Sequence, residues 1–160
     1  YPQATKELHH EVELVVALKS GGKDISPDSA MDCVYGYAVG IDFTRRDLQA
    51  IAKDKGRPWD VAKGFDQSAP ISAILPASEV SQLSDAEISL KVNGEKRQQA
   101  QLSDMIWSVP EIICELSKFF ELKPGDIIYT GTPSGVTAVI KGDRITASVA
   151  GIGSLDFKIV

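Results

Sequence analysis

Cysteine and long apolar runs are both scarce in this chain of 160 residues. Its two cysteines, Cys33 and Cys114, are too few and too isolated for a disulfide framework, so a reducing, cytoplasmic setting is expected. No segment approaches the roughly 20 apolar residues of a membrane-spanning helix, and no secretory signal is present. The sequence therefore predicts a protein without a membrane partner.

Positive charge is also in short supply. The chain has 17 lysines and arginines against 22 aspartates and glutamates, which gives a net charge of −5. This balance argues against a generally basic surface, so no nucleic-acid partner is expected. Hydrophobic residues make up 43% of the chain, an ordinary value for a globular protein, and the length suffices for one domain with its own core.

Two glutamates, Glu11 and Glu13, open the apolar segment 11–18, whose alternating β-branched and leucine positions predict a strand. Side chains two residues apart in a strand share one face, about 6 to 7 Å apart at the backbone. Two carboxylates so close repel and raise each other's pKa unless a cation lies between them. Asp42 closes a second predicted strand, residues 35–43, and could supply a third oxygen. Three carboxylates without a sulfur ligand suit a hard cation such as Mg²⁺ or Mn²⁺.

Two other interpretations of these acids stay open at this level. The carboxylates could face solvent or pair with Arg45 and Arg46, without any metal. Alternation also puts His9 on the face of the glutamates, so one histidine and two carboxylates could hold iron. A packing role for His9 is the simpler interpretation.

The remaining sequence predicts short helices and strands, with strands in the majority. Asn93-Gly94, between two alternating arms, is a strong β-hairpin signal. Helical spacing from Ser103 to Phe120 predicts a helix that Pro110 should bend or break. The other expected elements are a short helix over 26–34, a helix capped by Thr44 and ending near Lys55, an irregular functional loop over 56–72, and strands over 126–130, 145–149 and 155–160. This balance predicts a mainly β or α+β domain.

Five segments carry a resemblance to a known family: LHHEVEL, GYAVGIDFTRRDLQ, GRPWDVAKGFDQSAPIS, VNGEKRQ and IIYTGTPSGV. In this order they resemble the fumarylacetoacetate hydrolase superfamily, and in particular its small acylpyruvase-like members. The match extends over nearly the whole chain. The resemblance implies a mixed β-sandwich roll of the C-terminal domain type of that family, α+β and mainly β with a few short helices. It also implies a homodimer with one divalent metal ion per subunit.

The resemblance further implies roles for individual side chains. Glu11, Glu13 and Asp42 would be the ligands of Mg²⁺ or Mn²⁺. Lys63, in WDVAKGFD, would be a catalytic lysine beside the substrate, where its charge could hold a carboxylate or stabilise an enolate. The substrate-binding residues would be Arg46, Gln49, Lys63 and Thr132.

Without the resemblance, each of these substrate contacts has a simpler interpretation. Lys63 could be a solvated loop lysine, and Arg46 with Gln49 could form an ordinary exposed helix face. The turn at Thr132 could be a plain chain reversal. Three nearby aromatic residues could line a pocket or simply pack: Trp59, Phe65 and Phe43.

The activity implied by the resemblance is metal-dependent hydrolysis of a carbon–carbon bond in a β-diketone acid of the acylpyruvate or fumarylpyruvate type. Such a reaction belongs to the breakdown of aromatic compounds, and its 2-oxo acid end would chelate the metal. Decarboxylation of oxaloacetate, or isomerisation of an oxo-enol dicarboxylate, needs the same platform and is the first alternative. A catalytically inactive module that binds a small acid is the second.

One feature of the resembled family is missing from the sequence. Its members have a preceding segment with a His-x-x-Glu pair that is proposed to activate the attacking water. His10 to Glu13 has this spacing, but Glu13 is already counted as a metal ligand. We therefore expect residues 1–160 to form an N-terminally incomplete catalytic domain, which carries the platform for metal and substrate without the base.

Overall fold

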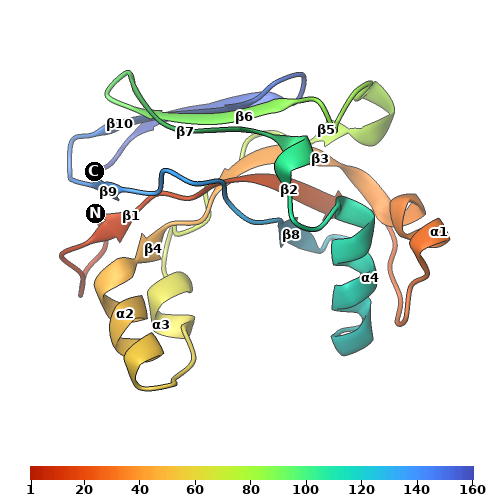
Figure 1. Ribbon diagram of the computed structural model, residues 1–160, viewed down its shortest axis with the longest axis horizontal. Helices are drawn as coiled ribbons and strands as arrows, with labels where there is room; N and C mark the ends of the chain where they lie inside the picture. The colour runs from red at the N-terminus through yellow and green to blue at the C-terminus, as the bar shows by residue number, and fades with distance from the viewer.

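The structure, a computed structural model, describes residues 1–160 and contains two four-stranded sheets, a small three-stranded sheet and a few short helices (Figure 1). The outer sheet has the order β11-β10-β6-β7, the inner sheet β5-β3-β2-β8, and the small sheet β4-β1-β9. The strands are β1 (Leu8–His9), β2 (Val12–Leu18), β3 (Val34–Ile41), β4 (Thr44–Arg45), β5 (Leu75–Pro76), β6 (Glu87–Val92), β7 (Glu95–Gln101), β8 (Ile127–Tyr129), β9 (Ala138–Val139), β10 (Arg144–Val149) and β11 (Gly153–Lys158). The α-helices are α1 (Pro27–Ala30), α2 (Arg46–Asp54), α3 (Asp60–Lys63) and α4 (Val109–Phe119), and the 3₁₀ turns are η1 (Met31–Cys33), η2 (Ala77–Glu79) and η3 (Leu102–Asp104). This confirms the predicted mixed, mainly β fold.

The outer and inner sheets lie face to face and enclose the apolar core (Figure 1). Alternate residues of β2, from Val12 to Leu18, belong to this core. Because successive strand residues point to opposite faces, Glu13, Val15 and Ala17 lie on the far face of the inner sheet. Val15 and Ala17 are also buried, so β2 is covered on both faces. This double coverage explains why the strand is a nearly continuous apolar run in the sequence.

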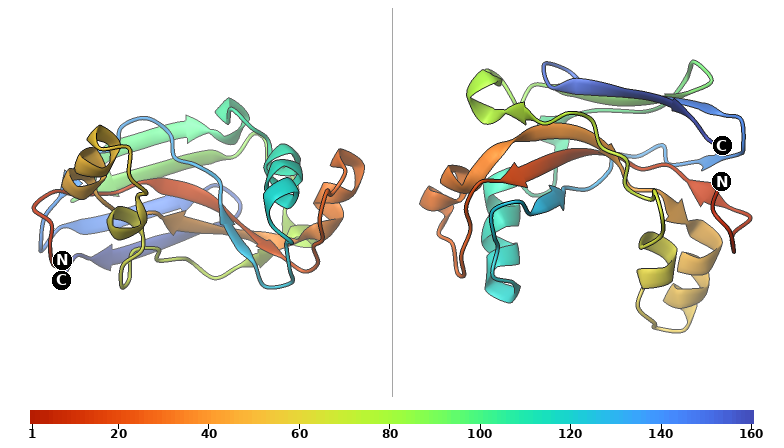
Figure 2. Two further views of the ribbon diagram at one scale, coloured as in Figure 1. Left: turned by 90° about the horizontal axis from the view of Figure 1, so that it is seen from below. Right: turned by 180° about the vertical axis from the view of Figure 1, so that it is seen from behind.

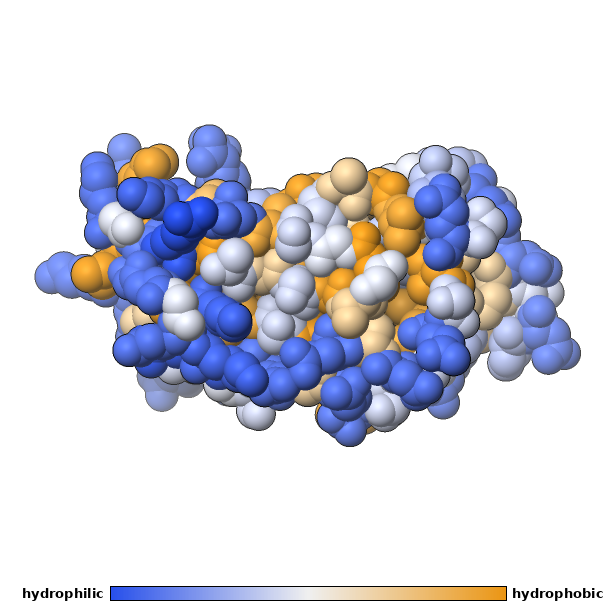
Figure 3. Space-filling view, turned by 90° about the horizontal axis from the view of Figure 1, so that it is seen from above, coloured by the Kyte–Doolittle hydropathy of each residue, from blue (hydrophilic) through white to orange (hydrophobic).

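The far side of the outer sheet carries short hydroxyl side chains. Ser89 of β6 lies opposite Ser148 of β10, with their Oγ atoms 3.2 Å apart. Figure 3 looks onto this side, where hydrophilic residues gather toward both ends and along one border, and hydrophobic and near-neutral residues occupy the middle. One face on the core and one toward solvent is the usual arrangement of an antiparallel sheet.

The helices α2, α3 and α4 lie on the side of the inner sheet that faces away from the outer sheet (Figure 1). Seen from below, α2 and α3 stand at one end of the inner sheet and α4 at the other, with the strands running between them (Figure 2). No helix of the structure is long and apolar enough to cross a bilayer. The face of the inner sheet that points away from the core is therefore framed by helices at both ends.

The pairing of β2 with β3 positions the carboxylates discussed below. It is regular from Val12 opposite Ile41 to Ala17 opposite Gly36, and an irregularity follows between Ala17 and Leu18. Glu11 comes directly before β2 rather than within the strand. The predicted hairpin at Asn93-Gly94 is present as the turn between β6 and β7.

Two predictions around α2 and α3 are wrong in detail. Thr44 does not cap α2, because it forms β4 with Arg45 and pairs with His9 of β1. The helix begins instead at Arg46. The segment 56–72 is not wholly irregular, since it contains α3.

Pro110 does not interrupt a helix but lies in the first turn of α4. A proline there loses no hydrogen bond, because the first N–H groups of a helix have no partner inside it. Ser108 precedes the helix as its N-cap, and both its N–H and its hydroxyl contact Glu111 Oε2 at 2.7 Å. The helix therefore starts where it was expected to break.

Candidate metal and substrate site

The antiparallel register of β2 and β3 brings three carboxylates to one face of the inner sheet. Glu13 lies opposite Gly40, and the Asp42 N–H donates to Glu11 O at 2.8 Å. Asp42 thus stands beside Glu11, one step beyond the end of the paired strands. Since alternate residues share a face, Glu11, Glu13 and Asp42 all point away from the core. One oxygen from each of the three lies within 4.8 Å of the other two.

Two basic side chains from α2 and α3 reach this acidic cluster. Lys63, the last residue of α3, places Nζ 2.6 Å from Glu11 Oε2 and 2.5 Å from Asp42 Oδ2. Arg46, the first residue of α2, donates from Nη2 to Glu11 Oε1 at 2.5 Å and from Nη1 to Gln49 Oε1 at 2.5 Å. Gln49 is only 6% exposed. Arg46 and Gln49 therefore face the acids rather than solvent, and Lys63 is not a solvated loop lysine.

Burial and mutual repulsion determine the charge of two of the acids. Burial, reinforced by the charges of Asp42 and Glu11, raises the pKa of Glu13 to about 7, although the Gly131 N–H opposes this shift. Burial also raises the pKa of Asp42, and the hydrogen bond from Lys63 offsets part of the rise. Glu13 thus lacks a cation in direct contact, and the single contact of Asp42 with Lys63 does not fully offset its burial.

For Glu11 and Lys63, hydrogen bonds to charged partners together shift the pKa more than burial does. Burial favours a higher pKa for Glu11, but the hydrogen bonds from Lys63 and Arg46 outweigh it and hold that pKa below its ordinary value. Burial favours a lower pKa for Lys63, but its hydrogen bonds to Asp42 and Glu11 raise the pKa instead. Lys63 is therefore a cation at neutral pH and cannot act as a base.

The turn that follows β8 lies against the acidic cluster. The Gly131 N–H donates to Glu13 Oε2 at 2.6 Å. Gly131 has a φ of 103°, a left-handed conformation that favours glycine. The next residue, Thr132, accepts a hydrogen bond at Oγ1 from Gln98 Nε2 at 2.8 Å. The structure therefore brings Thr132 to the border of the cluster, through the contact of its neighbour with Glu13.

Tyr129 is a residue of this site that the sequence did not reveal. It packs over Gly40, where a Cβ would lie 2.6 Å from Tyr129 Cε1. Burial, with a contribution from the charges of Glu13 and Asp42, raises the pKa of Tyr129 to about 12. Its hydroxyl donates to Ala69 O at 2.8 Å and so fastens the loop after α3 to the sheet. Only the pairing of β8 with β2 puts Tyr129 there, and periodicity does not show which strands pair.

Gln98 is a second residue that was not among the expected site residues, and it lies beside His10; both are fully buried. His10 Nδ1 lies 2.8 Å from Gln98 Oε1, and His10 Nε2 lies 3.0 Å from Thr137 Oγ1. Burial lowers the pKa of His10, so the imidazole is neutral. The sequence held one signal for Gln98: it occupies an inward-facing position of a predicted hairpin arm, where an apolar residue is usual.

His9 does not join the carboxylates. Its Nε2 lies 3.0 Å from Glu7 Oε1, and its Nδ1 accepts from Arg46 Nε at 3.3 Å. Both ring nitrogens therefore have other partners, and the iron site considered above is not formed.

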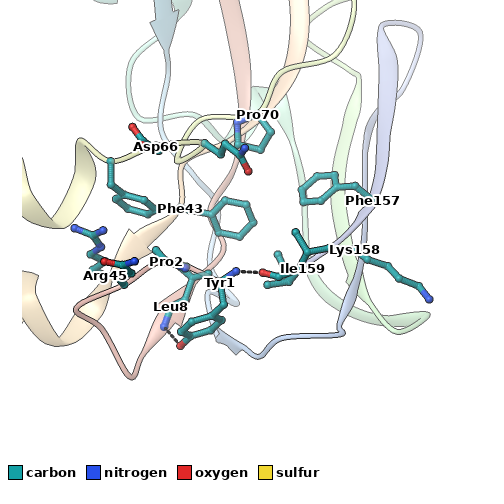
Figure 4. Close-up of a pocket in the computed structure, with 14 residues that line it drawn as sticks. Tyr1, Pro2, Leu8, Phe43, Arg45, Asp66, Pro70, Phe157, Lys158 and Ile159 are labelled. Carbon is teal, nitrogen blue, oxygen red and sulfur yellow. Dashed lines mark hydrogen bonds between the residues drawn. The ribbon is translucent and has the colours of Figure 1, made fainter.

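The aromatic residues Phe43 and Phe65 line a separate cavity of about 510 Å³ near the two chain ends (Figure 4). Arg45 also turns toward it, with its guanidinium 4.4 Å from the centroid of the Phe65 ring, a cation–π arrangement. Trp59 does not line this cavity, and neither does any residue of the acidic cluster. Arg45 is thus not a partner of the acids, whereas Arg46 is.

The donors on this face fit a hard divalent cation. All three candidate ligands offer carboxylate oxygens, which Mg²⁺ and Mn²⁺ prefer. Carboxylates crowded within 4.8 Å stay ionised only beside positive charge, and Glu13 receives no salt bridge of its own. Glu11, Glu13 and Asp42 are therefore suited to hold one such ion together.

Fold and site together define a β-sandwich protein with a candidate metal site of three carboxylates, flanked by a lysine and an arginine. The family model described as "Fumarylacetoacetate (FAA) hydrolase C-terminal" matches residues 1–160. The chain belongs to this family, as its sequence motifs predicted.

Individual relatives agree with this family. The chain is 45% identical over 159 residues to a fumarylpyruvate hydrolase of Ralstonia sp, covering 99% of this chain and 82% of the relative. It is 45% identical over 158 residues to a mitochondrial oxaloacetate tautomerase of Bos taurus, covering 99% of this chain and 72% of the relative. It is 49% identical to fumarylpyruvate hydrolase from Pseudomonas aeruginosa, whose crystal structure in complex with Mn²⁺ and pyruvate matches with a TM-score of 0.98 and covers 100% of this chain and 69% of that chain.

Proposed function

We propose that this chain provides the metal and substrate platform of a hydrolase that cleaves a carbon–carbon bond in an acylpyruvate, such as fumarylpyruvate. The observation that carries the proposal is the cluster of Glu11, Glu13 and Asp42, whose oxygens lie within 4.8 Å of one another. The same fold, at 49% identity, belongs to a fumarylpyruvate hydrolase crystallised with Mn²⁺ and pyruvate.

A divalent ion held by Glu11, Glu13 and Asp42 would polarise the 2-oxo acid end of the substrate and balance the charge of the departing enolate. Lys63 contributes a second positive charge beside it. An ammonium group has three N–H donors, and in the structure two of them are used by Glu11 and Asp42. The third is available to a substrate carboxylate or to an enolate oxygen, whose charge it would stabilise.

Arg46 and Gln49 would orient the substrate from the side of α2. Arg46 can only donate hydrogen bonds, so the Gln49 atom that it contacts must be the carbonyl oxygen Oε1. The Gln49 amide nitrogen is thereby free to donate to a substrate oxygen. Thr132, on the opposite side of the cluster, offers its hydroxyl to the substrate carboxylate. These donors would hold an acid whose charged end lies next to the metal site.

Replacement of Asp42 by Asn tests this proposal. The amide side chain would keep the shape of the aspartate and remove a ligand charge, so we expect loss of Mn²⁺-dependent turnover of fumarylpyruvate with the fold intact. Asp32→Asn is the matched control, because Asp32 is an exposed aspartate away from the cluster. Turnover by D42N at the level of the unsubstituted protein would remove Asp42 from the site.

A second candidate function is isomerisation or decarboxylation of oxaloacetate. A relative named oxaloacetate tautomerase is 45% identical to this chain, which favours this candidate. Both reactions need the same chelation and enolate stabilisation but no attack by water. A panel of acetylpyruvate, fumarylpyruvate and oxaloacetate, with and without Mg²⁺, separates the two enzymatic functions. Binding of these acids without turnover of any of them would point to an inactive binding module.

We also propose that the protein is a homodimer of the cytoplasm. Several large apolar side chains are exposed, among them Ile106 at 94% and Phe119 at 72%, and such side chains often lie in subunit interfaces. Both cysteines are free, as in a reducing compartment. Light scattering after gel filtration measures the subunit number, and a monomer at every concentration would contradict the dimer.

A further inference from the structure

Gln98 of β7 is a buried side chain whose hydrogen-bonding groups are all occupied. It is 0% exposed. Its Oε1 accepts from the Val12 N–H at 3.1 Å and lies 2.8 Å from His10 Nδ1. Its Nε2 donates to Thr132 Oγ1 and to Pro133 O, both at 2.8 Å. A primary amide has two acceptor sites and two N–H donors, so no capacity is left over.

Two backbone groups determine which way this amide points. The Val12 N–H can only donate, so the Gln98 atom beside it must be the oxygen. The Pro133 carbonyl can only accept, so the Gln98 atom beside it must be the nitrogen. The reversed amide would lose both bonds and set like groups against each other in a buried site, which is costly. The orientation of Gln98 is therefore imposed by the main chain.

This orientation decides the role of the Thr132 hydroxyl. Because Gln98 Nε2 donates to it, Thr132 Oγ1 acts as an acceptor in that bond. Its single hydrogen is then free, since the Gln98 bond is the only one that the hydroxyl makes in the structure. A free hydroxyl hydrogen next to a site for an acid is suited to bind a carboxylate, which only accepts.

Gln98 also joins the two segments that carry the site. Val12, which it contacts, lies between the candidate ligands Glu11 and Glu13. Thr132 and Pro133 belong to the turn that contacts Glu13 through Gly131. One buried side chain thus fixes the position of the turn relative to the ligand-bearing strand.

We propose that Gln98 is a positioning residue for substrate binding: it holds the Thr132 hydroxyl as a donor toward the substrate carboxylate. This inference rests on the proposed function, in which Thr132 contacts the acid. Gln98 itself touches neither substrate nor metal and acts through Thr132.

Binding of pyruvate to the Mn²⁺-loaded protein provides the first test. Gln98→Met keeps the length of the side chain but removes both amide donors. We expect its Kd for pyruvate to rise about tenfold, the effect of losing one hydrogen bond to a charged group, with unchanged Mn²⁺ affinity. Gln99→Met is the matched control, because Gln99 is the next residue of β7 and is exposed. Calorimetry gives both affinities.

A double-mutant cycle separates positioning from general stability. Thr132→Val removes the hydroxyl, so adding Q98M to T132V should weaken pyruvate binding little further. Thr132→Ser keeps the hydroxyl, so Q98M should still cost about tenfold in that background. Equal losses from Q98M in the presence and absence of the hydroxyl would overturn the proposal.

Neutron diffraction of the deuterated, unsubstituted protein with Mn²⁺ and pyruvate tests the direction of the Gln98–Thr132 hydrogen bond, and this test does not require Q98M to fold. We expect both amide deuterons of Gln98 on Thr132 Oγ1 and Pro133 O, and the Thr132 deuteron on the ligand. A Thr132 deuteron directed at Gln98 would overturn the positioning role alone. Failure of the unsubstituted protein to bind pyruvate at all would overturn the proposed function, and this inference with it.

Discussion

At the scale of single residues, Glu13 couples the site to pH, because burial raises its pKa to about 7. A proton and a metal ion compete for the same carboxylate. We therefore expect Mn²⁺ affinity to fall as the pH drops through about 7, by about tenfold per pH unit below it. Isothermal calorimetry across neutral pH measures this slope. A carboxyl of ordinary pKa would show the same loss only at lower pH.

The metal-free protein should show the opposite trend in stability. The pKa of Glu13 is higher in the folded protein than its ordinary value of 4.5, so the folded state binds this proton more tightly. The contribution of Glu13 to stability is thus present below that ordinary value and is lost as the pH rises through about 7. Glu13→Gln removes this titration, whereas Glu79→Gln, at an exposed site, should retain it. Identical pH profiles for E13Q and the unsubstituted protein would contradict the assignment.

Lys63 should matter more for turnover than for stability. Lys63→Met removes the charge that we expect to stabilise a developing enolate, so kcat should fall by about 10². Glu11 would keep its hydrogen bond from Arg46, and the partly exposed Asp42 can take up a proton. Lys91→Met, at an exposed position of β6, is the control. If K63M kept its kcat, Lys63 would have only the structural role of joining Glu11 to Asp42.

At the scale of elements, a glycine of β3 lets side chains of β2 and β8 pack closely against the backbone. A Cβ at Gly40 would lie 2.5 Å from Val15 Cγ2 and 2.6 Å from Tyr129 Cε1. Gly40→Ala should therefore destabilise the protein by about 1 to 3 kcal/mol through overpacking. It should also displace Tyr129 from Ala69 and loosen the loop that follows α3. Chemical denaturation measures the first effect, and hydrogen exchange in residues 64–72 measures the second.

Gly153→Ala is the matched control for this strand glycine. A Cβ at Gly153 would meet Ser72 Oγ at 3.5 Å, an ordinary contact, so this change should be nearly neutral. Equal stability losses in both variants would show that the backbone, and not the packing of Tyr129, explains the effect of G40A.

Local patterns predicted those elements whose signals act within a few residues. The Asn93-Gly94 hairpin and the strand carrying Glu13 were both recognised, because turn chemistry and alternation are local. Thr44 had the chemistry of a helix cap, but pairing with β1 overrode it. Pro110 was misjudged because a proline is harmful inside a helix and harmless in its first turn. The sequence pattern predicted a helix here but did not show that the helix begins at Val109.

The candidate site likewise contains some residues that local spacing predicted and others that it could not predict. Spacing alone put Glu11 and Glu13 on one face, but the addition of Lys63 relied on family motifs. Tyr129 reaches the site only through the pairing of β8 with β2, which are distant in sequence. Gln98 reaches it through contacts with His10 and the Val12 N–H, which are also distant in sequence. No period within one segment reports such contacts, so the sequence could mark Gln98 as an unusual inward-facing residue but could not place either residue at the site.

At the scale of the whole molecule, metal binding should stabilise the fold. Glu11, Glu13 and Asp42 come from two segments that the ion would join in the folded state only. At about 100 times its Kd, Mn²⁺ should add about 2.7 kcal/mol to the free energy of unfolding. Thermal denaturation at rising Mn²⁺ concentration measures this. Asp42→Asn should lose most of the gain, and an equal gain in D42N would count against a shared ion.

The irregularity between Ala17 and Leu18 lies at the end of the β2–β3 pair farthest from the acids. Residues 19–33 connect β2 to β3 and lie beyond this irregularity. We therefore expect a change in the length of this connection to leave the opposition of Glu13 and Gly40 unchanged. An engineer could therefore graft a short segment at its exposed residues 26–29, provided that the buried Ala30 and Cys33 are kept, while the chemistry at the base of the hairpin is preserved.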